Sequence, residues 1–184
     1  MQQFGAIASL TEHDWQWVTN VNVLGTARTV REFLPLLRAR DGWRRIVLTA
    51  SSSVLAPSIR LGVYQASKYA VMGLGETLRE ELAPEGIGVT VLFPGGMMTR
   101  HLESSADARP AEFGTSALDP TDVEAMLAHA QLEEDDLATP EHAVRNLLAD
   151  LEADEPFSIT HGSFRAAWER RRDAIDAAFD RMEK

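Results

Sequence analysis

Residues 60–96 read RLGVYQASKYAVMGLGETLREELAPEGIGVTVLFPGG, which joins a helical pattern to a short apolar run. Apolar side chains recur at helical spacing up to about Ala83, and a proline and a glycine then end the helix. The run IGVTVLF (87–93) is typical of a buried strand, and RRIVLTA (44–50), before the helix, has the same character. A strand, a long helix and a second strand with short connections predict a βαβ unit and therefore a parallel sheet.

The rest of the chain extends this α/β pattern. A long helix is predicted over about residues 9–42, with Thr11 and Asp14 as its capping signal and Pro35 as a kink or a mark of its last turns. Further elements are expected as helices near 120–131, 140–154 and 163–184 and as a third strand at 157–161. We therefore predict one domain, 1–184, with about three visible strands, the first of which keeps an unpaired edge.

Composition limits the possible functions. The 184 residues are 45% hydrophobic, enough for one core, and the absence of cysteine excludes thiol catalysis and Cys-based zinc sites. The formal net charge of −10, which comes from the acidic segment 103–155, argues against a nucleic-acid partner. Apolar stretches are too short for a membrane span and the start has no secretory pattern, so we expect a cytoplasmic protein. The five histidines have no metal-ligand spacing, which predicts no metal site.

Tyr64 and Lys68 are four residues apart at the start of a predicted helix, which places both side chains on one face. A phenol has a pKa near ~10, and a nearby ammonium favours the phenolate and lowers that pKa. Such a pair could transfer a proton to or from an alcohol or carbonyl oxygen near neutral pH. The alternative is a half-buried tyrosine beside a solvated lysine, because this spacing is common.

Three further features surround this pair. Ser51 ends the first strand and Pro94-Gly95 follows the second, so both are expected at the edge of the sheet where ligands of open parallel sheets bind. Asn22 lies within the long helix, where its side chain or a nearby backbone carbonyl could hold a water molecule. The alternatives are an ordinary turn serine and an exposed polar asparagine.

In this order and spacing, WQWVTNVNVLGTARTVREFLPLL, RIVLTASSS, YQASKYAVMGLGETLREEL, GIGVTVLFPGGMMT and the late ITH resemble the short-chain dehydrogenase/reductase family. The similarity runs from about residue 5 to the end of the printed sequence. It implies a partial Rossmann-like, doubly wound parallel sheet with flanking helices. The activity it implies is hydride transfer between NAD or NADP and a secondary alcohol or ketone.

By this resemblance, Tyr64 corresponds to the catalytic acid/base, and Lys68 to the lysine that lowers the tyrosine pKa and binds the nicotinamide ribose. Ser51 corresponds to the serine that orients the substrate, with Ser52 as an alternative in register. Asn22 corresponds to the asparagine that supports a water-linked proton relay.

The same resemblance assigns cofactor contacts to the segment after the second strand. Pro94 and Gly95 would form the wall of the nicotinamide site, Met97 would offer its backbone N–H to the carboxamide, and Thr99 its hydroxyl. Residues 97–139 would form the loop that covers the substrate. The side chains that could line an apolar pocket there are Met97, Met98, Leu102, Phe113, Met126 and Leu127, which favours an apolar substrate.

The sequence contains no GxxxGxG turn, the family's pyrophosphate-binding motif. We therefore expect the chain to represent the C-terminal part of the fold, with weak or absent cofactor binding by these residues alone. The alternatives are a non-catalytic module that binds a full-length homologue and an unstable fragment without a role. A homo-oligomer, a dimer or tetramer, is also expected, because helices matching those around Asn22 and Tyr64 commonly form the family's subunit interface.

Overall fold

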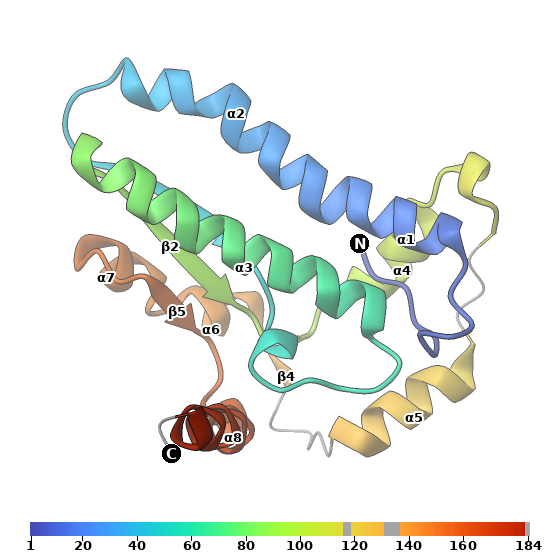
Figure 1. The fold of residues 1–184 in the computed structure, drawn as a ribbon. Coiled ribbons are helices and arrows are strands. Elements are labelled where there is room, and N and C mark those ends of the chain that lie inside the picture. The colour runs from blue at the N-terminus through green and yellow to red at the C-terminus, as the bar shows by residue number, and fades with distance from the viewer. Residues whose placement is uncertain (116–118, 131–136, 183–184) are drawn as a thin grey trace.

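A computed structural model describes residues 1–115, 119–130 and 137–182. Its centre is a three-stranded parallel sheet in the order β1-β2-β5, formed by β1 (Arg44–Thr49), β2 (Ile87–Phe93) and β5 (Phe157–Ile159) (Figure 1). Ile46 pairs with Val89 across β1 and β2, and Leu92 pairs with Ser158 across β2 and β5. The predicted fold class is confirmed, and within the described ranges β1 pairs only with β2.

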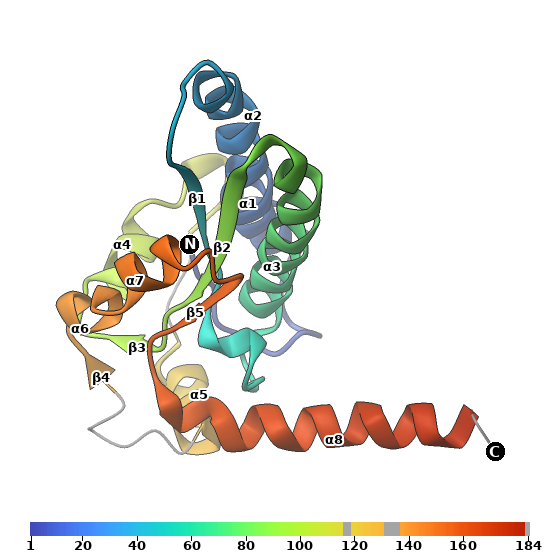
Figure 2. The same ribbon diagram turned by 90° about the vertical axis from the view of Figure 1, so that its left-hand side faces the viewer.

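Helices cover both faces of this sheet (Figure 2). One face carries α3 (Gly62–Leu82) and the long helical segment before β1. The opposite face carries α6 (Pro140–Val144) and α7 (Leu147–Glu152). A single helix was predicted over 140–154, but two short helices form instead, separated at Arg145 and Asn146, and asparagine is a poor interior helix former.

The segment before β1 is one continuous helical path with an irregular middle. It consists of α1 (Glu12–Thr19), a π-helical segment (Asn20–Leu24) and α2 (Gly25–Arg38). Thr11 and Asp14 form the predicted capping box at its start, and Pro35 lies in the last turns of α2, also as predicted. The sequence pattern did not predict the π-helical segment, which is where Asn22 lies.

The core lies between the sheet and α3. One buried cluster joins Leu48, Val71, Val91 and Phe93, and Trp168 packs against it from the C-terminal side of the chain. Close contact requires Gly75 on α3, since a Cβ atom there would lie 2.4 Å from a methyl of Val91. The sheet and α3 are therefore closely packed against each other, and this packing positions α3 on the sheet.

The region predicted to cover the substrate contains several short elements. They are β3 (Gly96–Met97), α4 (His101–Asp107), α5 (Pro120–Ala130) and β4 (Leu137–Ala138), and β3 pairs with β4 in parallel. The helix predicted near 120–131 is confirmed except for residue 131, which lies outside the described residues. The pairing of β3 with β4 was not predicted, because two-residue strands leave no periodic signal.

An ion pair fixes the segment after α4 to the start of the chain. Arg109 Nη1 lies 2.5 Å from Asp14 Oδ1, and the two side chains are 4% and 12% exposed. The same guanidinium donates to the carbonyl oxygen of Phe113 and lies over the ring of Trp17. Phe113 is partly buried and packs against the core cluster around Trp17.

The last described element, α8 (Arg165–Met182), projects away from the rest of the molecule (Figure 2). It corresponds to the helix predicted over 163–184, of which residues 183–184 lie outside the described residues. Across the described part of the chain, no helix combines the length and apolar character needed to cross a membrane.

Candidate active site

The start of α3 brings Tyr64 and Lys68 onto one face, as the spacing predicts. Lys68 Nζ lies 5.6 Å from the centre of the Tyr64 ring and donates a 2.9 Å hydrogen bond to the carbonyl oxygen of Thr49. Thr49 is the last residue of β1, so the lysine connects α3 to the carboxyl end of that strand. Both side chains are half-buried.

Ser51 lies beside Tyr64 because the chain turns sharply after β1. Its hydroxyl accepts a hydrogen bond from the backbone N–H of Ser53 and caps a short 3₁₀ turn, Ser52–Val54. It is also hydrogen-bonded to the Tyr64 side chain. Ser52 instead donates its backbone N–H to the carbonyl oxygen of Pro94, 2.8 Å away. Of the two serines considered from the sequence, Ser51 is thus the one in contact with the tyrosine.

Burial determines the electrostatics of this group. It raises the pKa of Tyr64 above its ordinary value, and the hydrogen bond with Ser51 opposes that rise. Burial also lowers the pKa of Lys68 to about 8. The sequence predicted a lowered pKa for Tyr64, whereas the structure gives a raised one. The reason is that loss of solvation raises this pKa more than the hydrogen bond with Ser51 lowers it.

Asn22 lies in the π-helical segment and is buried. Its Nδ2 donates to Ser67 Oγ at 2.9 Å and to the carbonyl oxygen of Met1 at 2.8 Å, and its Oδ1 accepts from the backbone nitrogen of Met1. Ser67 precedes Lys68 on α3. The asparagine is therefore a fixed link between the long helix and α3, and the alternative of an exposed polar residue is wrong.

The turn after β2 meets the turn after β5. Gly95 donates its backbone N–H to Thr160 Oγ1 at 3.0 Å, and a Cβ atom on Gly95 would lie 2.5 Å from the His161 ring. Only glycine fits this approach without displacement of the histidine. Pro94 and Gly95 thus form a close-packed surface at the carboxyl end of β2.

Met97 and Thr99 follow in the segment that leads to α4. Met97 belongs to β3, and its carbonyl oxygen accepts from the backbone N–H of Thr99 at 2.9 Å. Thr99 Oγ1 accepts from the backbone N–H of His101 at 3.3 Å. The hydroxyl of Thr99 therefore holds the start of α4, and both residues lie on the segment that leaves the Pro94-Gly95 turn.

His101 is a site residue that the sequence reasoning missed. Its ring centre lies 6.1 Å from that of Tyr64, at an interplanar angle of 56°. Burial lowers the pKa of His101, and the positive charges of the chain's first amino group and of Lys68 lower it further. The only signal available was its position two residues after Thr99, because its spacing to other histidines excluded a metal site and suggested nothing else.

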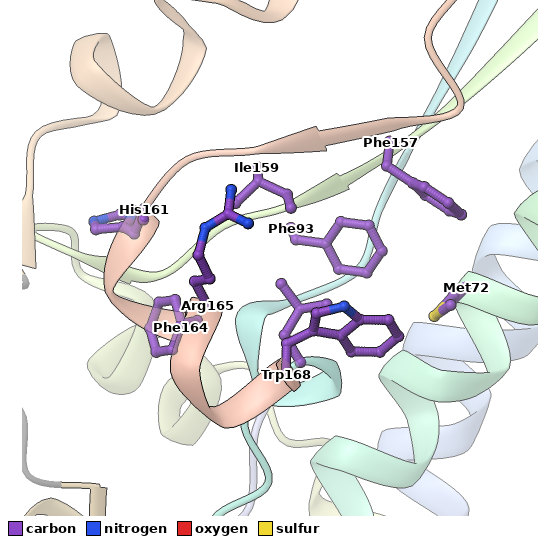
Figure 3. Close-up of a pocket in the computed structure, with 10 residues that line it drawn as sticks. Met72, Phe93, Phe157, Ile159, His161, Phe164, Arg165 and Trp168 are labelled. Carbon is purple, nitrogen blue, oxygen red and sulfur yellow. The ribbon is translucent and has the colours of Figure 1, made fainter. Parts of the chain in front are cut away.

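Two hollows lie near these residues. An open depression of about 520 Å³ runs between α2 and β1, and Asn22, Thr49 and Lys68 line one end of it. An apolar cavity of about 270 Å³ lies between β5, α3 and the start of α8 (Figure 3). The rings of Phe93 and Trp168 line this cavity. None of Ser51, Tyr64 and Lys68 contributes to its lining.

Four of the side chains expected to line an apolar pocket in the covering region differ in burial. Met98, Leu102 and Leu127 are exposed, and Phe113 is partly buried against the cluster around Trp17. Their role in a pocket stays a prediction. Among the described residues, no group of three or more His, Asp or Glu side chains could hold a metal ion.

Fold and site together define the class of the protein: a parallel α/β domain with Ser, Tyr and Lys side chains gathered where two strands end. The chain belongs to the short-chain dehydrogenase family, a family of oxidoreductases, whose model matches residues 1–110.

Curated proteins of this family match a little over half of the chain. The human dehydrogenase/reductase SDR family member 2, mitochondrial, is 36% identical over 95 residues, which cover 52% of this chain and 33% of that protein. A C alpha-dehydrogenase of Sphingobium sp. is 34% identical over 116 residues, which cover 63% of this chain and 38% of that protein. The chain thus matches about a third of the length of these curated relatives.

Solved structures match nearly the whole chain. A short chain dehydrogenase/reductase from Burkholderia phymatum, solved in complex with NAD, superposes with a TM-score of 0.83 at 25% identity. The match covers 97% of this chain and 64% of that one. A similar arrangement of elements thus occurs in a larger protein of the same family that binds NAD.

Proposed function

We propose that the chain carries the catalytic residues of an NAD- or NADP-dependent oxidoreductase that interconverts a secondary alcohol and a ketone. The supporting observation is the contact between Ser51 and Tyr64 beside Lys68, at the carboxyl ends of β1 and β2. The hydroxyl groups of Ser51 and Tyr64 can both hydrogen-bond one substrate oxygen. The ammonium group of Lys68, when charged, favours the phenolate form of Tyr64.

Tyr64 acts as the general acid/base. Its raised pKa keeps the phenol protonated near neutral pH, so it can donate a proton to a ketone oxygen during reduction. In the oxidative direction the phenolate is required, and both the Ser51 hydrogen bond and a charged Lys68 favour it. With a pKa of about 8, Lys68 gains or loses a proton closer to neutral pH than an exposed lysine does. Asn22 holds Ser67, and through it the first turns of α3, at the position that this proton transfer needs.

The residues present fit the nicotinamide half of such a cofactor. Lys68 provides a cation and Thr99 provides a hydroxyl, and both lie on segments that adjoin the carboxyl ends of β1 and β2. Pro94, Gly95, Met97 and Thr99 would form the wall of the nicotinamide site, and Lys68 and Tyr64 would face the ribose. When bound, a nicotinamide supplies or accepts the hydride.

We infer the substrate class from the residues near Tyr64. His101 adjoins the tyrosine ring, and Met98 and Leu102 are exposed on the segment that leads away from it. A mostly apolar alcohol or ketone suits these side chains.

The variant Tyr64→Phe tests the assignment. In a protein that contains this chain together with its dinucleotide-binding half, we expect turnover to fall by about 10³-fold, while far-UV circular dichroism stays unchanged. A Tyr64→Phe variant that retains activity would show that the tyrosine assignment is wrong.

Calorimetric titration of the 184-residue chain with NADH and with NADPH tests cofactor binding. Since the sequence lacks the glycine-rich pyrophosphate turn, we expect weak or no binding by these residues alone. Micromolar affinity for either nucleotide would contradict that expectation.

A second candidate function is a non-catalytic binding module. Val21, Leu24, Phe33 and Leu36 are large apolar side chains exposed along the π-helical segment and α2, a surface suited to a subunit contact. Size-exclusion chromatography with light scattering discriminates: Phe33→Glu should dissociate an oligomer that uses this surface, and a monomeric parent chain would count against the module.

A further inference from the structure

The apolar cavity between β5, α3 and the start of α8 has the size of a binding site for a small organic molecule (Figure 3). Its volume is about 270 Å³. Apolar cavities of roughly 150 Å³ stay free of water and bind benzene, so this cavity has room for more than a single benzene ring. The side chains of the Tyr64 site do not line it, so an inference about its ligand does not depend on the proposed function.

Aromatic rings make up a large part of the cavity wall. Three phenylalanines and a tryptophan line it, namely Phe93, Phe157, Phe164 and Trp168. The rings of Phe93 and Phe157 are tilted by 59° with their centres 5.8 Å apart. Aromatic groups pack preferentially in such tilted, edge-on or offset arrangements. A flat aromatic ligand can make the same kinds of contact with this wall, so the lining favours an aromatic ligand.

The part of the wall that α8 contributes is held in place. Trp168 packs against the hydrophobic core. Arg171, on the next turn, donates to the carbonyl oxygen of Val54 and to the Tyr69 hydroxyl, and its guanidinium lies 5.3 Å from the centre of the Trp168 ring. The cavity is therefore preformed, which reduces the entropy that a ligand must overcome on binding.

One arginine gives the cavity a positively charged side. Figure 3 shows the side chain of Arg165 extending from the start of α8 toward Ile159 on β5. Among the described residues that line the cavity, none is acidic. Arg165 Nη1 lies 3.8 Å from Glu169 Oε1, and this pair contributes little because the arginine side chain is 80% exposed. A guanidinium binds a carboxylate through two parallel hydrogen bonds, so a ligand with a carboxylate suits this side of the cavity.

We propose that the cavity binds a small aromatic carboxylate, with its rings against Phe93 and Trp168 and its carboxylate paired with Arg165. The cavity volume sets the size at one or two fused rings, the aromatic wall selects flat groups, and the guanidinium selects a negative charge.

NMR titration of the 184-residue chain with 2-naphthoate tests the proposal. We expect saturable binding with a Kd of about 1 mM or tighter, the range usual for a ligand of about thirteen non-hydrogen atoms. The neutral 2-naphthamide, which has the same shape, should bind at least about fivefold more weakly, because it lacks the charge-assisted pairing. Octanoate, which has the charge without the rings, should also bind more weakly. Absence of naphthoate binding, or tighter binding of octanoate, would overturn the proposal.

Methyl-labelled methionine shows where the ligand binds. Met72 lines the cavity, whereas Met97 and Met98 lie on the segment that follows the turn after β2. Naphthoate should therefore shift the methyl signal of Met72, which the variant Met72→Leu identifies, and leave those of Met97 and Met98 unchanged. Shifts confined to Met97 and Met98 would place the ligand elsewhere and overturn the assignment.

Variants test the two parts of the proposed site. Arg165→Gln should weaken naphthoate binding at least about fivefold and leave 2-naphthamide binding unchanged, because only the carboxylate pairs with the guanidinium. Arg170→Gln is the matched control, since it removes the same charge from the same helix at a residue that does not line the cavity. Ile159→Trp puts a larger side chain into the cavity and should weaken both ligands at least about tenfold.

Three results would contradict the proposal. Equal loss of binding in Arg165→Gln and Arg170→Gln would reduce the effect to net charge. Unchanged naphthoate binding in Ile159→Trp would exclude the cavity as the site. Loss of binding in Lys68→Met but not in Arg165→Gln would assign the carboxylate to the Tyr64 site instead.

Discussion

Lys68 Nζ donates a hydrogen bond to the carbonyl oxygen of Thr49, the last residue of β1, at a distance of 2.9 Å. This contact keeps an ammonium group, with a pKa lowered to about 8 by burial, beside the ring of Tyr64. Lys68 thus connects α3 to β1 through its hydrogen bond, and when protonated it also places a positive charge beside Tyr64. A change of pH through its pKa removes the charge.

The first prediction concerns the pH dependence of stability. The folded pKa of Lys68 is below its unfolded value, so the unfolded chain binds more protons between about pH 8 and 10.5. The free energy of unfolding therefore gains from deprotonation as pH rises through this window, and Lys68→Met should lose that part of the slope. Urea unfolding at several pH values measures it.

NMR of lysine-labelled chain checks the same group directly. Lys184 is the only other lysine, and Lys184→Arg assigns the two signals. A midpoint near 10.5 for Lys68 would contradict the effect of burial.

A second prediction concerns the hydrogen bond between Ser51 and Tyr64. Because this bond lowers a tyrosine pKa that burial raises, Ser51→Ala should raise the pKa of Tyr64 further. Phenolate absorbance follows the titration in a Tyr69→Phe background, which leaves one tyrosine. Ser52→Ala is the matched control, and a shift of the same size in that variant would refute the specific role of Ser51.

A third prediction uses two glycines. Gly95→Ala should lower the free energy of unfolding by about 1–3 kcal/mol, since the added methyl would overlap the His161 ring. Gly73→Ala, within α3 and with open space around it, should instead raise stability by roughly 0.5–1 kcal/mol. Urea denaturation compares them, and equal effects would show that the turn after β2 is not tightly packed.

The fourth prediction concerns the buried ion pair. Arg109→Met leaves Asp14 charged and largely buried, so we expect a loss of about 3–5 kcal/mol in the free energy of unfolding at neutral pH. Arg100→Met, which removes an exposed pair with Glu103, should cost at most about 1 kcal/mol.

The pH dependence of this pair has a definite sign. Burial alone would raise the pKa of Asp14, but hydrogen bonds from Thr11 and the charge of Arg109 outweigh it and lower that pKa. The carboxylate therefore stabilises the fold above its unfolded pKa, and this contribution is lost as pH falls through the folded value. If the free energy of unfolding falls by the same amount on acidification in the wild type and in Arg109→Met, the ion pair is not the source of this pH dependence.

Strong local patterns predicted the main elements. The apolar runs of β1 and β2 and the helical periodicity of α3 set the sheet, and the four-residue spacing placed Tyr64 beside Lys68. The π-helical segment around Asn22 was not predictable, because its signal is an extra residue per turn rather than a change in hydrophobicity. Nor was the raised pKa of Tyr64, since it depends on how deeply packing buries the phenol.

The site also differed in its periphery. Phe113 packs against the cluster around Trp17, and His101 lies against Tyr64 although no motif marks it. Both contacts depend on the path of the chain after β3. That path is determined by tertiary contacts of two-residue strands and short helices, which leave little periodic signal in the sequence.

The parallel pairing of β1 with β2 around α3 has a consequence for how the chain folds. Thr49, Ser51, Tyr64, Lys68 and Gly95 fall within fewer than fifty residues, so closing the loops between them costs little entropy. The pairing of β2 with β5 joins residues more than sixty positions apart. We expect the contacts around Tyr64 to form early and the edge strand to be added late, so the order of folding would follow the sequence distance of each contact.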